Sequence, residues 1–256
     1  MPLHDTQAFV LRSFTLKEAD KICVLLTRDA GQVRGVAKGA RRLRSRFGAS
    51  LEPFTEIQIT YYQNESKDLV QLSSCEIVQS HFAAGISSER LGVIHYLTEL
   101  LIEFTPAHEP NERVYRLVAA TVEALKGADD TQLVALTRYF EVWLLKLAGF
   151  LADMKSCGDC GKTFDENETI WLDNEGQPHC RTCSDSRGDA LVAATRQTLR
   201  AMLTQAPNKF LTTNADAATL QSLGGITIRL IHRVLERALK SYDLLDRLRP
   251  IEISKG

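Results

Sequence analysis

Four cysteines near the middle of the chain constrain its fold more than any other feature. They form two Cys-x2-Cys pairs, Cys157 with Cys160 and Cys180 with Cys183, separated by nineteen residues. Two such pairs can close tetrahedrally around one zinc ion. Four thiolates fill the coordination shell and leave no position for an activated water, so the pattern favours a structural ion over a catalytic one. We therefore expect one structural Zn2+ held by these four cysteines.

The segment between the two pairs predicts the fold of this module. Residues 168–172 read as a short strand, and residues 173–176, Asp-Asn-Glu-Gly, are typical of a tight turn. A hairpin between two cysteine knuckles predicts a zinc ribbon. His179 directly precedes the second pair and could replace one cysteine as a ligand without making the site catalytic.

The charge of the module indicates what it does not do. The segment from Asp153 to Asp189 carries nine acidic residues and four basic ones. Because an acidic surface repels phosphate, we expect the module to brace the fold or to contact a protein rather than to bind nucleic acid. An alternative is a zinc enzyme that acts on nucleotides, since a histidine next to Cys-x2-Cys resembles part of a deaminase motif; the motif's His-x-Glu element does not precede it here.

Length and composition set broad limits. The chain has 256 residues, of which 44% are apolar, enough for one large domain or two to three smaller ones. Its formal net charge is -1, so a role with nucleic acid would need an uneven placement of charge. No apolar run is long enough to span a bilayer and the first residues lack the features of a signal peptide, so we expect a cytoplasmic protein. Cys23 and Cys75 lie in strand-like stretches and would serve as small buried apolar residues.

The first 80 residues have the pattern of a small β-barrel. Short apolar or alternating stretches predict five strands, at residues 6–13, 21–28, 33–40, 56–62 and 69–78. No helical pattern among them is long enough for a crossover connection. We therefore expect residues 1–80 to form a five-stranded barrel of the oligonucleotide-binding (OB) type.

A purely basic stretch lies within this predicted barrel. Residues 33–50 contain no acidic side chain and six basic ones: Arg34, Lys38, Arg41, Arg42, Arg44 and Arg46. A loop of this charge would attract a phosphate backbone and release its counterions, which predicts a DNA-binding site. Nearby aromatic residues, Phe47, Phe54, Tyr61 and Tyr62, could stack on bases or could equally belong to the barrel core.

The remainder of the chain has helical periodicity. Helices are expected from Ser88 as N-cap to Phe104, over residues 114–125 and over residues 133–147, then from Asp189 as N-cap to about Thr204, and finally over residues 226–242. We expect one α-helical domain, residues 81–152 and 188–256, with the zinc module, residues 153–187, inserted in it. The last helix would present a second basic face, which could also be simply solvated: Arg229, Arg233, Arg237 and Lys240.

No recognisable catalytic motif occurs along the chain. The sequence lacks Gly-x-Ser-x-Gly, a complete phosphate loop, Gly-x-Gly-x-x-Gly and His-Glu-x-x-His. A binding protein is therefore favoured over an enzyme. A scaffold for protein interactions with an incidental basic loop is a further alternative.

Two stretches of sequence resemble a known family. The segment Arg34-Gly-Val-Ala-Lys-Gly-Ala-Arg-Arg, continued through Arg44-Ser-Arg46 to Leu51-Glu-Pro-Phe54, is similar to the basic loop of the bacterial RecO recombination mediators. Residues 138–149, Arg-Tyr-Phe-Glu-Val-Trp-Leu-Leu-Lys-Leu-Ala-Gly, resemble that family's central helix. The four-cysteine module and a helical tail then follow in the same order, so the resemblance covers nearly the whole chain.

This resemblance implies a fold and a function. The fold would be an N-terminal OB barrel and a helical domain with an inserted zinc module. The function would be binding of single- and double-stranded DNA, annealing of complementary strands and, with RecR, replacement of the single-strand binding protein SSB by RecA in recombinational repair at the nucleoid. The six basic loop residues would contact DNA. The family also docks the acidic C-terminal tail of SSB on its helical domain, and Arg138 is the candidate to meet the carboxylate of that tail.

Overall fold

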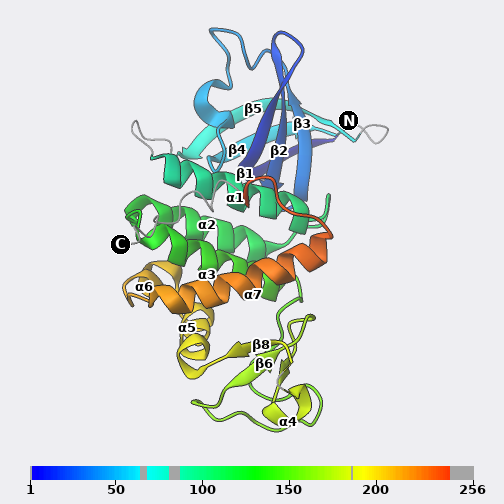
Figure 1. Ribbon diagram of the computed structural model, residues 1–256. Helices are drawn as coiled ribbons and strands as arrows, with labels where there is room; N and C mark the ends of the chain where they lie inside the picture. Colours follow the sequence, from blue (N-terminus) through cyan, green and yellow to red (C-terminus); the bar gives the residue numbers. More distant parts are fainter. Residues whose placement is uncertain (1, 64–67, 81–86, 186, 243–256) are drawn as a thin grey trace. The chain divides into compact units, whose positions relative to one another are not determined.

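The computed structural model describes residues 2–63, 68–80, 87–185 and 187–242, and these divide into two compact units (Figure 1). The first unit runs to Val118 and includes the stretch that begins at Leu239; the second is Ala119–Ala238. The division falls inside a helix rather than near residue 80, because the first turns of that helix pack on the barrel. Tyr115, for example, lies against Phe9, with ring centroids 5.0 Å apart, and donates a hydrogen bond of 3.0 Å to Glu56. The three predicted domain boundaries stay predictions.

The first unit contains the predicted five-stranded barrel. Its strands are β1 (Leu3–Leu16), β2 (Asp20–Thr27), β3 (Gly31–Ala37), β4 (Glu56–Tyr62) and β5 (Val70–Gln79). They close in the order β1-β2-β3-β5-β4, with β1 pairing back to β4. The pair β3–β5 is parallel and all the others are antiparallel. The prediction of an OB-type barrel is confirmed.

The barrel core explains most of the aromatic residues near the basic stretch. Phe47, Phe54 and Tyr61 are buried, whereas Tyr62 keeps 39% of its surface exposed. Phe47 and Leu51 bracket a short 3-10 helix, η1 (Gly48–Leu51), and both belong to the core cluster inside the strands. The basic stretch is therefore fixed at one end by β3 and at the other by two apolar anchors.

The helix α1 (Ser88–Phe104) lies against one end of the barrel, as Figure 1 shows. The Gln32 side chain of β3 donates to the carbonyl oxygens of Ile102, at 3.2 Å, and Thr105, at 2.6 Å, where α1 ends. The N-cap of α1 is Ser87 and not the predicted Ser88, because Ser87 has extended backbone and its hydroxyl accepts from the amide of Arg90. The next helix, α2 (Glu112–Gly127), begins in the first unit and ends in the second.

The second unit contains the cysteine module and its supporting helices. Its elements are α3 (Gln132–Leu147), β6 (Ile170–Leu172), β7 (Pro178–His179), α4 (Arg181–Ser184), β8 (Asp189–Leu191), α5 (Ala193–Thr204), α6 (Pro207–Leu211) and α7 (Ala217–Leu235). The expected hairpin is present as β6 and β7, which confirms the strand and turn predicted between the cysteine pairs. An additional strand, β8, pairs with the other edge of β6.

Two predicted helix boundaries in this unit are wrong. Asp189 does not cap α5; it belongs to β8, opposite Leu172 of β6, and α5 begins only at Ala193. The last helix spans Ala217–Leu235 instead of residues 226–242. The side chain of Asp216 caps its start by accepting from the amide of Thr219, and Glu236, with φ of 53°, ends it. Among the described residues, no helix combines the length and the apolar character that a membrane span requires.

Candidate nucleic-acid interface and metal centre

The six basic residues of residues 33–50 all expose their side chains on the first unit. The backbone of this loop is held beside the turn between β1 and β2. The amide of Gly39 donates to Asp20 at 2.8 Å, and the amide of Arg41 donates to the carbonyl oxygen of Ala19 at 3.0 Å. Gly39 has φ of 71°, a conformation that costs glycine little. The loop is thus anchored through its backbone, and its cationic side chains stay at the surface.

The charge of this basic loop is not neutralised within the described part of the chain. Arg41 donates from Nη1 to the main-chain carbonyls of Lys17 and Glu18, at 3.4 and 3.1 Å, and not to a carboxylate. Arg46 lies over the ring of Phe47, 5.1 Å from its centroid. No ion pair joins any of the six side chains to an acidic residue in the stretches that the structure describes. Such a loop favours binding of an external polyanion, because the counterions released when phosphates bind contribute to the free energy of binding.

An exposed aromatic residue that sequence reasoning missed lies on β1. Phe14 is 44% exposed, and the guanidinium of Arg12 lies 5.0 Å from its ring centroid. The spacing Arg-x-Phe was the available signal, because residues two apart in a strand share a face. Among the described residues of the barrel, Phe14 and Tyr62 are exposed and open to stacking, whereas Phe47, Phe54 and Tyr61 are core residues.

The four predicted cysteine ligands come together in the second unit. The Sγ atoms of Cys157, Cys160, Cys180 and Cys183 all lie within 4.8 Å of one another, and none is in a disulfide. The amide of Cys180 donates to Sγ of Cys157 at 3.4 Å. Burial raises the pKa of Cys157, but hydrogen bonds from the amides of Cys160, Cys180 and Asp159 outweigh it and lower the pKa to about 6. The four residues fit a tetrahedral metal ion, because four sulfur ligands this close together can surround one ion.

His179 is engaged elsewhere. Its Nδ1 lies 2.7 Å from a carboxylate oxygen of Asp159 and its Nε2 lies 2.9 Å from one of Asp173. Cys157, Asp159 and His179 do approach one another closely enough to be grouped as ligands. Because both ring nitrogens already face carboxylates, the cysteine set is the better ligand set, and His179 holds the ribbon together as a bridge.

The four residues predicted to form a second basic face do not lie on one helix. Arg237 and Lys240 follow the end of α7, and the amide of Lys240 donates to Glu99 of α1. Arg229 and Arg233 do lie on α7, but each meets the acidic module. Arg229 pairs with Asp189 and donates to Asn174 Oδ1 at 2.8 Å, and Arg233 pairs with Glu175. The prediction that all four share one face of the last helix is therefore wrong, because the helix ends at Leu235. A contact of these residues with DNA stays a prediction.

Arg138 is 7% exposed between α3 and α7. Its Nη1 donates to Glu141 at 2.8 Å and to Thr227 at 3.4 Å. Gly224 provides the space for it, since a Cβ there would come within 2.9 Å of Nη1. The charge of Arg138 is thus balanced inside the second unit, and its assignment to the carboxylate of a partner stays a prediction.

The structure thus defines a class of protein: an OB-type barrel whose basic loop meets no carboxylate in the described residues, joined to a helical unit in which four cysteines cluster as metal ligands would. Two family models match the chain, "Recombination protein O N terminal" over residues 1–81 and "Recombination protein O C terminal" over residues 87–243. The chain belongs to the RecO family of DNA repair and recombination proteins.

Individual relatives agree with this assignment. The chain is similar to the DNA repair protein RecO of Koribacter versatilis, with 30% identity over 96% of this chain and 99% of that protein. It is also similar to the RecO of Symbiobacterium thermophilum, with 32% identity over 97% of this chain and 99% of that protein. A match to the RecO of Bifidobacterium animalis subsp. lactis has 39% identity over 63% of this chain and 67% of that protein. The resemblance found in the sequence is confirmed.

Proposed function

We propose that this chain is a DNA-binding recombination mediator that binds single- and double-stranded DNA and anneals complementary strands. The observation that carries the proposal is the basic loop, where six exposed cations meet no carboxylate among the described residues. Such a surface attracts a polyanion of any sequence, since phosphate contacts carry no base information. The exposed rings of Phe14 and Tyr62 support a contact with unpaired bases.

The proposed mechanism needs no covalent step. Two DNA strands repel each other through their phosphates, and a cationic surface that neutralises both backbones lowers this repulsion. Base pairing then drives annealing. The protein would contribute by holding the strands at high local concentration, for which an exposed set of arginines is sufficient.

Membership of the family supports a proposal about partners. We propose that the protein acts with RecR at the nucleoid to replace SSB by RecA, and that a contact with the acidic tail of SSB brings it to coated single strands. Arg138 remains our candidate for that contact, and rearrangement of its bond to Glu141 would be required to free its guanidinium.

We propose that the four cysteines hold one Zn2+, which would stabilise the ribbon when bound. The donor set supports this assignment, because four sulfurs within 4.8 Å suit a closed tetrahedral site. A closed site has no position for substrate or water, so the role of the module would be structural.

The test is replacement of Arg41, Arg42 and Arg44 by Ala. We expect affinity for a single-stranded oligonucleotide to fall by about tenfold to a hundredfold at low salt, and the slope of log affinity against log salt to become shallower by about 2. The matched control replaces Arg113, Arg116 and Lys126, three exposed cations of α2, by Ala, which changes the net charge equally. Equal losses in the two variants, or no loss in either, would remove the basic loop from the proposal.

A further inference from the structure

The seam between α7 and the cysteine module is formed by arginines of the helix that contact acidic and amide side chains. Arg229 and Arg233 lie one turn apart on α7, so their side chains share a face. Both meet the tip of the ribbon hairpin and its neighbouring strand. Arg229 pairs with Asp189 and also reaches Asn174, whereas Arg233 pairs with Glu175. The arginines of α7 are thus covered by acidic groups of the same unit.

An open hollow lies at this seam. Its volume is about 530 Å³, and its lining consists of polar side chains only: Asn174, Glu175, Arg229 and Arg233. Two guanidinium groups and an amide can all donate hydrogen bonds to a phosphate oxygen. Glu175 is the one lining group that carries negative charge, and it occupies the place of such an anion.

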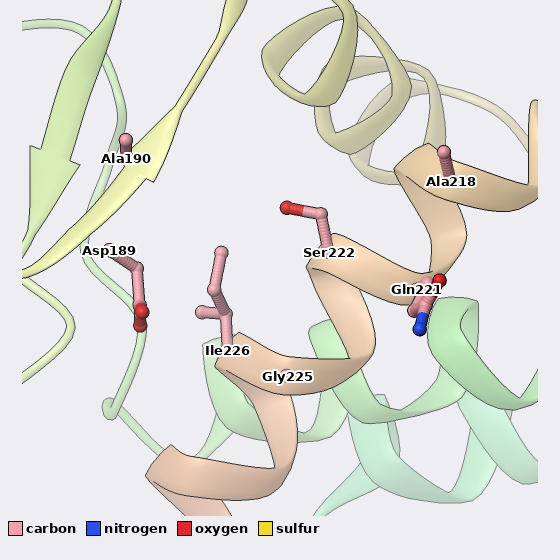
Figure 2. A pocket seen from close by; sticks show the side chains of 7 residues that line it. All are labelled: Asp189, Ala190, Ala218, Gln221, Ser222, Gly225 and Ile226. Carbon is pink, nitrogen blue, oxygen red and sulfur yellow. The ribbon is translucent and has the colours of Figure 1, made fainter.

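A second hollow along α7 differs in chemistry, as Figure 2 shows. Asp189 and Ala190 of β8 face Ser222, Gly225 and Ile226 of the helix, and Ala218 and Gln221 complete the lining. Its charged group is a carboxylate and its lining includes no cation, so it does not suit phosphate. Asp189 lines this hollow, and its ion-pair partner Arg229 lines the other one. The two neighbouring hollows therefore have opposite charge: this one is acidic and the other is basic.

The groups at the basic hollow differ in how firmly they are held. The backbone of Glu175 is fixed, because its amide and that of Gln177 donate to Asp173, at 2.8 and 2.9 Å. Its side chain, in contrast, is 63% exposed, and that of Arg233 is 45% exposed. An ion pair of such exposure contributes little to stability, so a dianion or a polyanion can displace it at little cost. Glu175 can therefore rotate away while the hairpin keeps its shape.

We infer that this hollow is a second phosphate-binding site for a nucleic-acid backbone, masked in the free protein by the side chain of Glu175. The inference rests on the proposed DNA-binding function and adds a site to it. Arg233 would bind the phosphate once Glu175 leaves, and Arg229, steadied by Asn174 and Asp189, would donate a second hydrogen bond. The acidic module thus limits binding at α7, so that the basic loop of the barrel engages DNA first.

The test is the substitution Glu175→Gln in the full chain, which keeps the shape of the side chain and removes its charge. We expect affinity for a fluorescent single-stranded oligonucleotide to rise by about twofold to fivefold, as loss of an exposed competing pair allows. The salt dependence should steepen by about 0.7, the contribution of one added phosphate contact on a single strand. Asp130→Asn is the matched control, since it removes one exposed acidic charge from the same unit away from the seam.

A second variant identifies the responsible cation. Adding Arg233→Ala to Glu175→Gln should return affinity and salt slope to the wild-type values. An unchanged affinity for Glu175→Gln, or an equal gain for Asp130→Asn, would overturn the inference. A third measurement is the affinity of the Glu175→Gln variant for inorganic phosphate. If free phosphate binds tightly enough to account for the whole gain in oligonucleotide affinity, the inference is overturned, because the ligand would then be free phosphate and not a backbone.

The two proposals fail separately. If the Ala substitutions at Arg41, Arg42 and Arg44 abolish binding while Glu175→Gln has no effect, the proposed function stands and the masked site is wrong. If those Ala substitutions have no effect but Glu175→Gln tightens binding, DNA binds at α7 and the basic loop is wrong.

Discussion

The basic loop of the barrel and the two arginines of α7, Arg229 and Arg233, carry the same kind of charge but have opposite electrostatic surroundings. The loop exposes six cations that pair with no carboxylate in the described residues, while Arg229 and Arg233 face Asp189 and Glu175. The difference is one of neighbours and not of residue type. It teaches that a cluster of arginines becomes a binding surface only where the fold supplies no anion of its own.

The acidic module is the cause of this difference, and its removal should have the largest effect. Chelation of the proposed zinc, or Cys160→Ser, should expose residues 153–187 to proteolysis while the barrel stays protected, because a structural zinc would contribute on the order of 10 kcal/mol to folding. Metal analysis of the purified protein should give one zinc per chain and much less for the variant. Full retention of the ion and of protection in the variant would mean that Cys160 is not a ligand.

The second prediction compares the stability effects of a buried arginine, Arg138, and an exposed one, Arg42. Arg138→Ala removes the cation that balances the buried carboxylate of Glu141 and should destabilise the protein by about 3–5 kcal/mol in urea titrations. Arg42→Ala, in the exposed loop, should change the free energy of unfolding by less than about 0.5 kcal/mol. The double variant with Arg138→Met and Glu141→Leu should recover most of the loss. Similar small effects at both arginines would show that the buried pair is not formed.

A third prediction compares the two basic surfaces directly by DNA affinity. Replacing Arg229 and Arg233 by Ala should weaken oligonucleotide binding by less than about twofold, because both are engaged by the module before DNA arrives. The loss should be far smaller than that for the triple substitution in the basic loop. A loss as large as that of the loop variant would mean that α7 contacts DNA without any unmasking.

The smallest expected effect concerns pH. Burial raises the pKa of Glu99, but hydrogen bonds from the Ser241 hydroxyl and from the amides of Ser241 and Lys240 outweigh it and hold the pKa below its usual value. A carboxyl with a depressed pKa stabilises the fold above its unfolded pKa of about 4.3, and this contribution is lost as the pH falls through the folded value.

Glu99→Gln should therefore lower stability at pH 7 by about 1 kcal/mol or less and should flatten the dependence of stability on pH below about 4.3. Urea titrations of both proteins at neutral and acidic pH measure the difference. If the free energies of unfolding of the two proteins differ by the same amount at every pH, the carboxylate of Glu99 is not the group that holds Ser241.

The local elements follow well from the sequence. Short apolar or alternating stretches were sufficient to place all five barrel strands, since each strand has one face in a single core. The cysteine spacing was sufficient to predict the cluster, because a tetrahedral site demands two knuckles. The ends of elements were less predictable. Asp189 has the residue type of a helix cap, yet pairing with β6 and with Arg229 places it in a strand.

The sequence by itself determined the barrel, the cysteine cluster and the family, because short-range periodicity and spacing encode them. Tertiary structure alone decided which charges are available. Arg42 and Arg233 are the same residue type, and only the packing of the ribbon hairpin beside α7 gives one of them a carboxylate partner. Electrostatic attraction acts through space between segments far apart in the chain, so a count of charges along the sequence cannot show which of them are neutralised.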